Sequence, residues 1–268
     1  MKLAICNEVF KGWAQPEVFR YVSELGYDGI EIAPFTLADS IEKVGAAARR
    51  QLRRDAERCK LEIVGLHWLL ASPPGLHISH PDESIRQRTV AYLNELIVCC
   101  KDLGGTIVVF GSPKQRNILP GLSLEQARDR AIATFKEVLP LARSSGVTIC
   151  LEPLPPEETN FVNTAAEAVE IIRAINHPNF QLHLDAKAMC SDREPIPTII
   201  RKYARYVRHV HANDPNRRGP GFGKLDFAPI FAALNSIGYR GYMSVEVFDY
   251  SPDPKTIASK SIEYLKRF

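Results

Sequence analysis

The sequence predicts a single (β/α)8 barrel spanning residues 1–268. Eight short apolar runs alternate with eight amphipathic helical stretches, and the turns from helix to strand are short. Alternating strands and helices give a parallel sheet, and eight such units close it into a barrel. The length of 268 residues agrees, because such barrels typically have about 250. An open doubly wound sheet is the alternative, but no Gly-x-Gly-x-x-Gly motif follows the first strand.

The expected strands are short runs rich in apolar and β-branched residues, as buried parallel strands are. Several follow a glycine that can end the preceding helix, namely Gly26, Gly104, Gly146 and Gly238. In chain order the strands are expected near residues 2–9, 28–34, 62–70, 106–111, 148–154, 180–187, 207–213 and 242–248.

The expected helices show apolar residues at helical spacing, as Val18, Tyr21, Val22 and Leu25 do in the first one. They are expected near residues 15–26, 41–60, 84–103, 124–145, 164–175, 195–205, 227–238 and 254–267. Loops rich in Pro and Gly follow strands at residues 70–81, 112–123 and 212–227. These loops belong to the C-terminal face of the barrel, where barrel enzymes carry their active sites.

Composition narrows the class of protein. Apolar residues make up 45% and charged residues 24%, as in an ordinary globular protein. A net charge of +3 is too small for the basic face that nucleic-acid binding usually needs. No apolar run approaches the roughly 20 residues of a membrane helix, and the first residues have the pattern of a strand, not of a signal peptide. We therefore expect a cytoplasmic enzyme without a nucleic-acid or membrane partner.

The cysteines are expected to be reduced. No Cys-x-x-Cys pair occurs, and Cys150 lies inside an apolar run, so buried thiols are favoured over a disulfide framework. The six positions are Cys6, Cys59, Cys99, Cys100, Cys150 and Cys190.

Four metal-type ligands stand where expected strands give way to loops: Glu152, Asp185, His211 and Glu246. Two Glu, one Asp and one His form a mixed oxygen and nitrogen set suited to one divalent cation. Because the strands are consecutive, their ends share one rim of the barrel. Burying an unpaired carboxylate is costly, so a cation must offset it. The alternative is four separate ion pairs with Arg or Lys.

Other polar residues give weaker signals. His67 ends the third strand and is expected to face the substrate, and Trp68 is expected either to form an apolar wall for a sugar ring or to pack in the core. His183 and His209 lie one layer deeper and are expected to be packed and hydrogen-bonded. Glu31 is either a site residue or part of a structural ion pair. His77, His80 and His177 are expected in loops or at the surface.

The eightfold pattern and its strand ends resemble the xylose isomerase-like TIM-barrel superfamily, and within it the D-tagatose 3-epimerase and D-psicose 3-epimerase group. The motifs that carry the resemblance are Leu151-Glu152-Pro153-Leu154, His183-Leu184-Asp185, His209-Val210-His211-Ala212-Asn213-Asp214 and Ser244-Val245-Glu246. The resemblance implies that Glu152, Asp185, His211 and Glu246 bind one divalent metal, most often Mn or Co, with Mg or Zn possible. It implies that the two Glu exchange the substrate proton and that Glu158 and Arg217 bind substrate.

One position departs from the resembled family, which has His three residues after the metal-binding Asp. Here Asp185-Ala186-Lys187-Ala188 places Ala188 there. Strand alternation points Lys187 away from the Asp185 face, unless a loop has already begun. The loss of an imidazole predicts a different substrate from the free ketohexoses.

The leading functional hypothesis is a metal-dependent ketose 3-epimerase or related sugar isomerase that acts through an enediolate. The alternative is a dehydratase or lyase on a keto-sugar or keto-inositol, which shares the enolate. A DNA-repair enzyme like endonuclease IV needs a richer His set, since Asp226-Phe227-Ala228 lacks its Asp-x-His. A non-catalytic sugar-binding protein of the same fold does not explain an intact ligand set. A homo-oligomer is compatible with the sequence.

Overall fold

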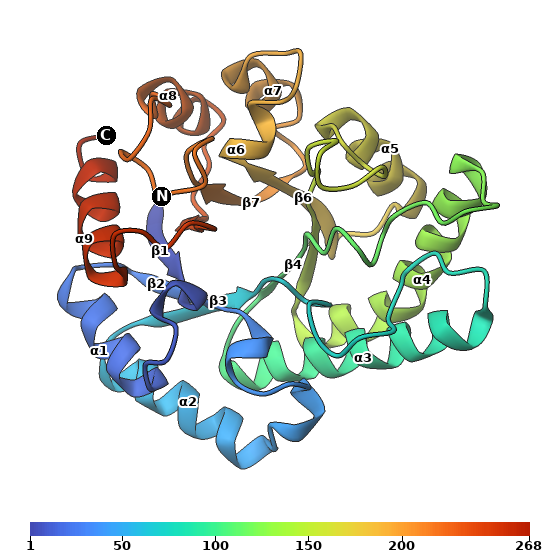
Figure 1. Cartoon of the computed structure of the whole chain (residues 1–268), viewed down its shortest axis with the longest axis horizontal. Coiled ribbons are helices and arrows are strands. Elements are labelled where there is room, and N and C mark those ends of the chain that lie inside the picture. Colours follow the sequence, from blue (N-terminus) through green and yellow to red (C-terminus); the bar gives the residue numbers. More distant parts are fainter.

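The computed structural model describes all 268 residues and forms a closed parallel barrel whose strands follow one another in chain order, surrounded by helices (Figure 1). Pairing of Ile5 with Val245 closes the ring between the first and last strands. The predicted fold class is confirmed. The strands are β1 Lys2–Cys6, β2 Gly29–Ile32, β3 Glu62–Leu66, β4 Ile107–Phe110, β5 Thr148–Leu151, β6 Phe180–Asp185, β7 Val207–Ala212 and β8 Tyr242–Val245.

The helices cover the outside of the strands, and the last one lies beside the first, so the ring has no gap there (Figure 1). Tyr27 Oη donates to the Ala258 carbonyl oxygen at 2.8 Å across that junction. The α-helices are α1 Gln15–Glu24, α2 Ala46–Arg58, α3 Glu83–Leu103, α4 Leu124–Ser145, α5 Ala165–Ile175, α6 Ala186–Met189, α7 Ile196–Lys202, α8 Ala228–Ser236 and α9 Pro254–Leu265. Three short 3-10 helices are η1 Asn7–Phe10, η2 Pro34–Thr36 and η3 Ile41–Lys43.

The structure differs from the sequence prediction at two helices. The predicted helix at 41–60 is two elements, η3 and α2, because Gly45 between them has an extended backbone and caps α2. The short helix α6 was predicted as strand and loop, yet it begins directly after β6. Asp185 caps it, since Asp185 Oδ1 accepts a hydrogen bond from the Ala188 backbone N–H at 2.7 Å.

Apolar side chains fill the space between strands and helices, and a small apolar group plugs the barrel. The plug consists of Ala4, Val64, Ile107, Val109 and Cys150. Glu152 stands two residues after Cys150 in the direction of the same strand, so the plug lies below the predicted ligands. The predicted ligands therefore gather at the C-terminal end of the barrel, above this apolar plug.

All six cysteines are free. Cys6, Cys99, Cys100 and Cys150 are buried as predicted, but Cys59 is only half-buried and Cys190 is exposed. Cys190 follows α6 at the rim of the barrel, where the chain has left the core, so burial was a wrong expectation there. None of the helices combines the length and the apolar character needed to cross a membrane.

Candidate active site

The structure brings the four predicted ligands together at the C-terminal end of the barrel. Glu152 follows β5, Asp185 ends β6, His211 lies near the end of β7 and Glu246 follows β8, and all four are buried. Ligand atoms of Glu152, Asp185 and His211 lie within 4.8 Å of one another, together with one from His183. Glu246 joins the group through His211, whose Nδ1 lies 3.1 Å from Glu246 Oε2.

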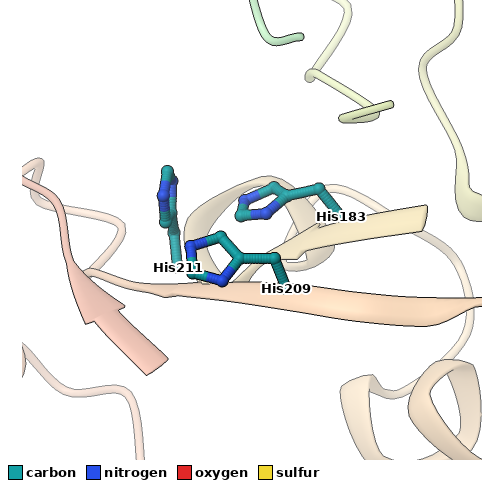
Figure 2. Close-up of side chains that lie close together, drawn as sticks. All are labelled: His183, His209 and His211. Carbon is teal, nitrogen blue, oxygen red and sulfur yellow. The ribbon is translucent and has the colours of Figure 1, made fainter. Parts of the chain in front are cut away.

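Three imidazoles converge beside this group (Figure 2). His183 extends from β6, and His209 and His211 extend from β7. His209 Nε2 lies 2.7 Å from Glu31 Oε2, so this histidine is packed and hydrogen-bonded as predicted. His183 is buried as predicted, but neither of its ring nitrogens has a hydrogen-bond partner, so the expected hydrogen bond is absent. His183 thus offers an additional nitrogen ligand beside the predicted four.

Glu31 is a site residue and an ion-pair partner at once, but its partners are histidines. Its carboxylate lies 2.7 Å from His209 Nε2 and 3.2 Å from His211 Nε2. Burial acts to raise the pKa of Glu31, but His209 and His211 overcome burial and hold that pKa well below its ordinary value. A buried carboxylate behind an imidazole fixes its ring orientation and raises its basicity, as it does in histidine metal ligands.

The environment pushes the pKa values of the two predicted catalytic carboxyl groups apart. Burial, together with the charges of Glu246 and Asp185, raises the pKa of Glu152 well above its ordinary value. Burial also acts on Glu246, but His211 outweighs it and lowers the pKa of Glu246. Burial and Glu246 raise the pKa of Asp185 to about 6. Two carboxyl groups with separated pKa values in one cavity are typical of an acid and base pair.

Separate ion pairs with Arg or Lys, the alternative interpretation of these four residues, are absent from the structure. The carboxylates of Glu152 and Glu246 form ion contacts only with histidines. The nearest guanidinium, Arg116, is completely buried and donates to the backbone oxygens of Glu152 at 2.7 Å and Phe110 at 2.8 Å. Sequence reasoning missed Arg116, because nothing in its loop signals burial. The alternative is therefore wrong.

The residues present fit a divalent cation. Three buried carboxylates and His211 supply oxygen and nitrogen donors, none of the carboxylates forms an ion pair with Arg or Lys, and His183 offers two nitrogens that have no partner. Gly111 leaves room for the carboxylate of Glu152, because a Cβ at Gly111 would stand 1.7 Å from Glu152 Oε2. The backbone is thus shaped around a carboxylate directed into the site.

A cavity of about 850 Å³ opens above these residues, which is ample for a sugar. The four residues predicted to bind substrate all line it: His67, Trp68, Glu158 and Arg217. Glu152 and Glu246 line the same cavity, from β5 and β8. A second cavity of about 800 Å³ lies outside the barrel between α4 and α5 and contains none of the predicted site residues.

Trp68 is 37% exposed and lines the cavity, so the core-packing alternative was wrong and the side chain forms part of a wall. Its ring centroid lies 6.0 Å from that of Phe248 and 5.9 Å from that of Phe35, so the three rings form an aromatic wall. Its indole Nε1 also donates to Glu246 Oε1 at 2.8 Å. The backbone of Trp68 has φ +52°, a strained value for this residue type and one often found at functional sites.

The strand ends at Asp185, so the exception stated for Lys187 applies and alternation does not direct it away from the site. Because α6 replaces the expected strand, Lys187 turns into the cavity, where its Nζ pairs with the Glu158 carboxylate. Lys187 Nζ also lies 4.8 Å from the ring centroid of Phe248, over which Arg217 sits at 5.9 Å on its own strained backbone, with φ +70°. The two cationic side chains therefore lie against Phe248 and extend the aromatic wall that Phe248 forms with Trp68.

The remaining histidines lie outside the four-residue group, which consists of the predicted ligands Glu152, Asp185, His211 and Glu246. His67 is completely buried, and its Nε2 lies 2.9 Å from Glu8 Oε2, a partner that sequence analysis did not identify. His80 and His177 are half-buried in loops. His77 also lies in a loop, as predicted, but the loop folds over it and buries it against Thr89, whose Oγ1 accepts from the His77 backbone N–H at 2.9 Å.

Comparison with known proteins agrees with this geometry. A family model described as xylose isomerase-like TIM barrel matches residues 19–268. The chain belongs to this family. The resemblance stated from the sequence is therefore confirmed, and the family assignment rests on almost the full length of the chain.

Named relatives extend the comparison. The chain is 30% identical over 256 residues to the L-ribulose 3-epimerase of Mesorhizobium japonicum, covering 92% of this chain and 81% of that protein. It is 26% identical over 277 aligned positions to the 3-dehydro-D-guloside 4-epimerase of Escherichia coli, covering 99% of each. The structure of D-psicose 3-epimerase with D-tagatose from Clostridium cellulolyticum has a TM-score of 0.83 at 24% identity and covers 98% of this chain and 90% of that one. The prediction of an enzyme of the isomerase and epimerase type is confirmed by these relatives.

Proposed function

We propose that this protein is a sugar epimerase. It inverts the configuration of a carbon beside a ketone, such as carbon 3 of a ketose. The observation that carries the proposal is the pair of buried carboxyl groups, Glu152 and Glu246, which face one cavity from different strands. The relatives named as 3-epimerases and as a 4-epimerase of a keto-glycoside support it.

Glu152, Asp185, His211 and Glu246 would hold one divalent cation, with Mn as the favoured metal. When bound, that cation supplies Lewis acidity at the sugar carbonyl. The ionised carboxylate of Glu246 takes the proton from the carbon beside the carbonyl, and the electron pair of that C–H bond moves toward the carbonyl oxygen, which gives an enediolate. Glu152, which lines the same cavity from a different strand, returns a proton to the opposite face of the same carbon. In the reverse direction the two residues exchange roles.

The substrate lies between two walls in this proposal. The aromatic wall of Trp68 and Phe248 packs against the ring or chain, while Glu158 and Arg217 bind its hydroxyl groups. His67 forms part of the cavity floor. The apolar plug closes the barrel below the site, so water can enter the cavity only from the C-terminal rim.

A lyase remains the second candidate, because one observation favours it. Ala188 replaces the histidine of the resembled epimerases, and Lys187 brings an ammonium group into the cavity. An ammonium group can protonate a leaving hydroxyl on the next carbon, after which the enediolate expels water instead of taking up a proton.

The test of the proposal is a product analysis. The protein is stripped with a chelator, reloaded with Mn and incubated with a panel of free ketoses, keto-glycosides and keto-inositols. An epimerase gives a product of unchanged mass and altered configuration, and the stripped protein gives none. A product that has lost one water identifies the lyase. Absence of any conversion across the panel would contradict both reactions.

Replacing Glu158 by Gln or Arg217 by Lys is expected to weaken substrate use without removing the metal. Both side chains line the cavity but lie outside the four-residue group, so kcat/KM should fall by about tenfold or more while bound metal stays stoichiometric. Steady-state kinetics and metal analysis of the same samples check this. Loss of metal from Arg217→Lys would contradict the assignment.

Replacing Ala188 by His is expected to shift substrate preference. The Ala188 methyl group does not line the large cavity, so no imidazole reaches the substrate from this position, and an unpaired polar group in a site costs about 1–3 kcal/mol. The natural protein should therefore prefer a glycoside, deoxy or keto sugar over free ketohexoses, and Ala188→His should move the ratio of their kcat/KM values by about tenfold toward ketohexoses. If the unaltered protein turns over fructose, tagatose or psicose fastest, this expectation fails.

A further inference from the structure

A second buried group of ligands lies beside the four-residue site. Glu8 stands in η1 directly after β1, and His67 directly follows β3. Glu8 is 4% exposed and His67 is fully buried, and His67 Nε2 lies 2.9 Å from Glu8 Oε2. The proton transfers proposed above use neither residue.

Glu246 completes this second group. Glu8, His67 and Glu246 each offer one ligand atom, and these three atoms lie within 4.8 Å of one another. Glu8 Oε1 is buried and has no hydrogen-bond partner, so one strong acceptor is left unsatisfied inside the protein. His67 Nδ1 is also buried without a hydrogen-bond partner, and Glu31 Oε1 lies 3.9 Å from it, beyond hydrogen-bond distance. The group therefore contains one carboxylate oxygen and one imidazole nitrogen that are unsatisfied.

The balance of charge favours a cation here. A connected group of five buried carboxylates occupies this end of the barrel, linked through His67 and His211: Glu8, Glu31, Glu152, Asp185 and Glu246. Two cationic side chains lie near these carboxylates. Arg116 is completely buried, and Lys187 is paired with Glu158. One divalent cation offsets two of these negative charges. Glu152 carries a proton in the proposed reaction and Glu8 pairs with His67, so part of this charge is already offset, and a further cation would offset what remains.

We propose that Glu8, His67 and Glu246 bind a second divalent cation, next to the one assigned to the four-residue site and sharing Glu246 with it. The donor set of two carboxylates and one imidazole suits Mn or Zn. His67 and Glu246 line the cavity, so a cation at this place faces the substrate. The inference goes beyond the proposed epimerase function, which needs one cation only.

Counting bound Mn tests the proposal. Metal-free protein is titrated with MnCl₂, and bound Mn is counted by equilibrium dialysis, with the folding of each variant checked by circular dichroism. We expect two Mn per chain for the unaltered protein and one for Glu8→Gln or His67→Gln. As a matched control, Glu62→Gln removes an exposed carboxylate at the opposite end of β3 and should leave two. Saturation of the unaltered protein at one Mn, or two Mn retained in Glu8→Gln, overturns the proposal.

Anomalous diffraction from Mn-soaked crystals of the unaltered protein gives an answer that does not depend on any variant. A peak within bonding distance of Glu8 and His67 supports the second site, and its absence beside a peak at Asp185 refutes it.

The variant Asp185→Asn separates the question of the second site from the question of the proposed function. If the unaltered protein binds one Mn and Asp185→Asn binds none, the four-residue site stands and the second site falls. If the unaltered protein binds none, both fall.

Discussion

Replacing Glu152 or Glu246 by Gln should lower turnover by at least about a hundredfold and leave the barrel folded. Gln keeps the size and the hydrogen-bonding oxygen but can neither accept nor return the substrate proton, and positioned proton transfer usually contributes about 10²–10⁴-fold. Each side chain faces the cavity, so the change introduces no new steric contact with the core. Circular dichroism and steady-state kinetics measure the two expectations separately.

Metal content must be measured in the same samples, because each of these residues is also assigned as a ligand. A variant that keeps its metal and loses turnover identifies a proton-transfer residue. Glu158→Gln is the matched control, since it makes the same change in the same cavity without removing either proposed acid or base. Full turnover by Glu152→Gln or Glu246→Gln would remove that residue from the mechanism.

Replacing Gly111 by Ala should cost about a hundredfold in activity with little effect on the fold. The added Cβ would stand 1.7 Å from Glu152 Oε2, so the carboxylate must move. The end of a flexible side chain moves at small cost to stability, but a displacement of about 1 Å at a reacting group can cost about 10²-fold in rate. Thermal unfolding and kcat/KM are the two measurements.

The control for this substitution is Gly45→Ala. Gly45 caps α2 and does not adopt a left-handed backbone, and a methyl group added there would have no other heavy atom within 4 Å, so alanine fits. Its activity should stay within about twofold of the unaltered protein, in line with other exposed substitutions that touch no site. If Gly111→Ala behaves like Gly45→Ala, the carboxylate of Glu152 does not need its present position.

The barrel and the meeting of the four strand-end residues were predictable because they follow from periodicity alone. Strand side chains alternate with a period of two, and consecutive parallel strands end at one rim, so Asp185 and His211 had to lie near each other once the barrel closed. Local residue types sufficed, since no long-range contact had to be known in advance.

The other site residues depend on contacts that the sequence does not encode locally. Lys187 turns inward because Asp185 caps a helix in place of continuing the strand, and strand alternation gives the opposite direction. Glu8 lies in a 3-10 turn, where no simple period applies. Arg116 is buried only because its loop folds over the ends of β4 and β5, where the carbonyls of Phe110 and Glu152 are free to accept. Each of these positions is decided by tertiary packing.

Turnover of an accepted sugar in deuterated water tests the central claim most directly. If Glu246 removes a proton and Glu152 returns another to the opposite face, the returned proton comes from a cavity residue that exchanges with solvent. The account predicts one deuterium at the inverted carbon of the first product formed, seen by mass spectrometry and assigned by NMR. With Glu152→Gln in place of the unaltered protein, the deuterated epimer should form at least about a hundredfold more slowly. Formation of the epimer with its original hydrogen retained at that carbon would contradict the two-carboxylate mechanism.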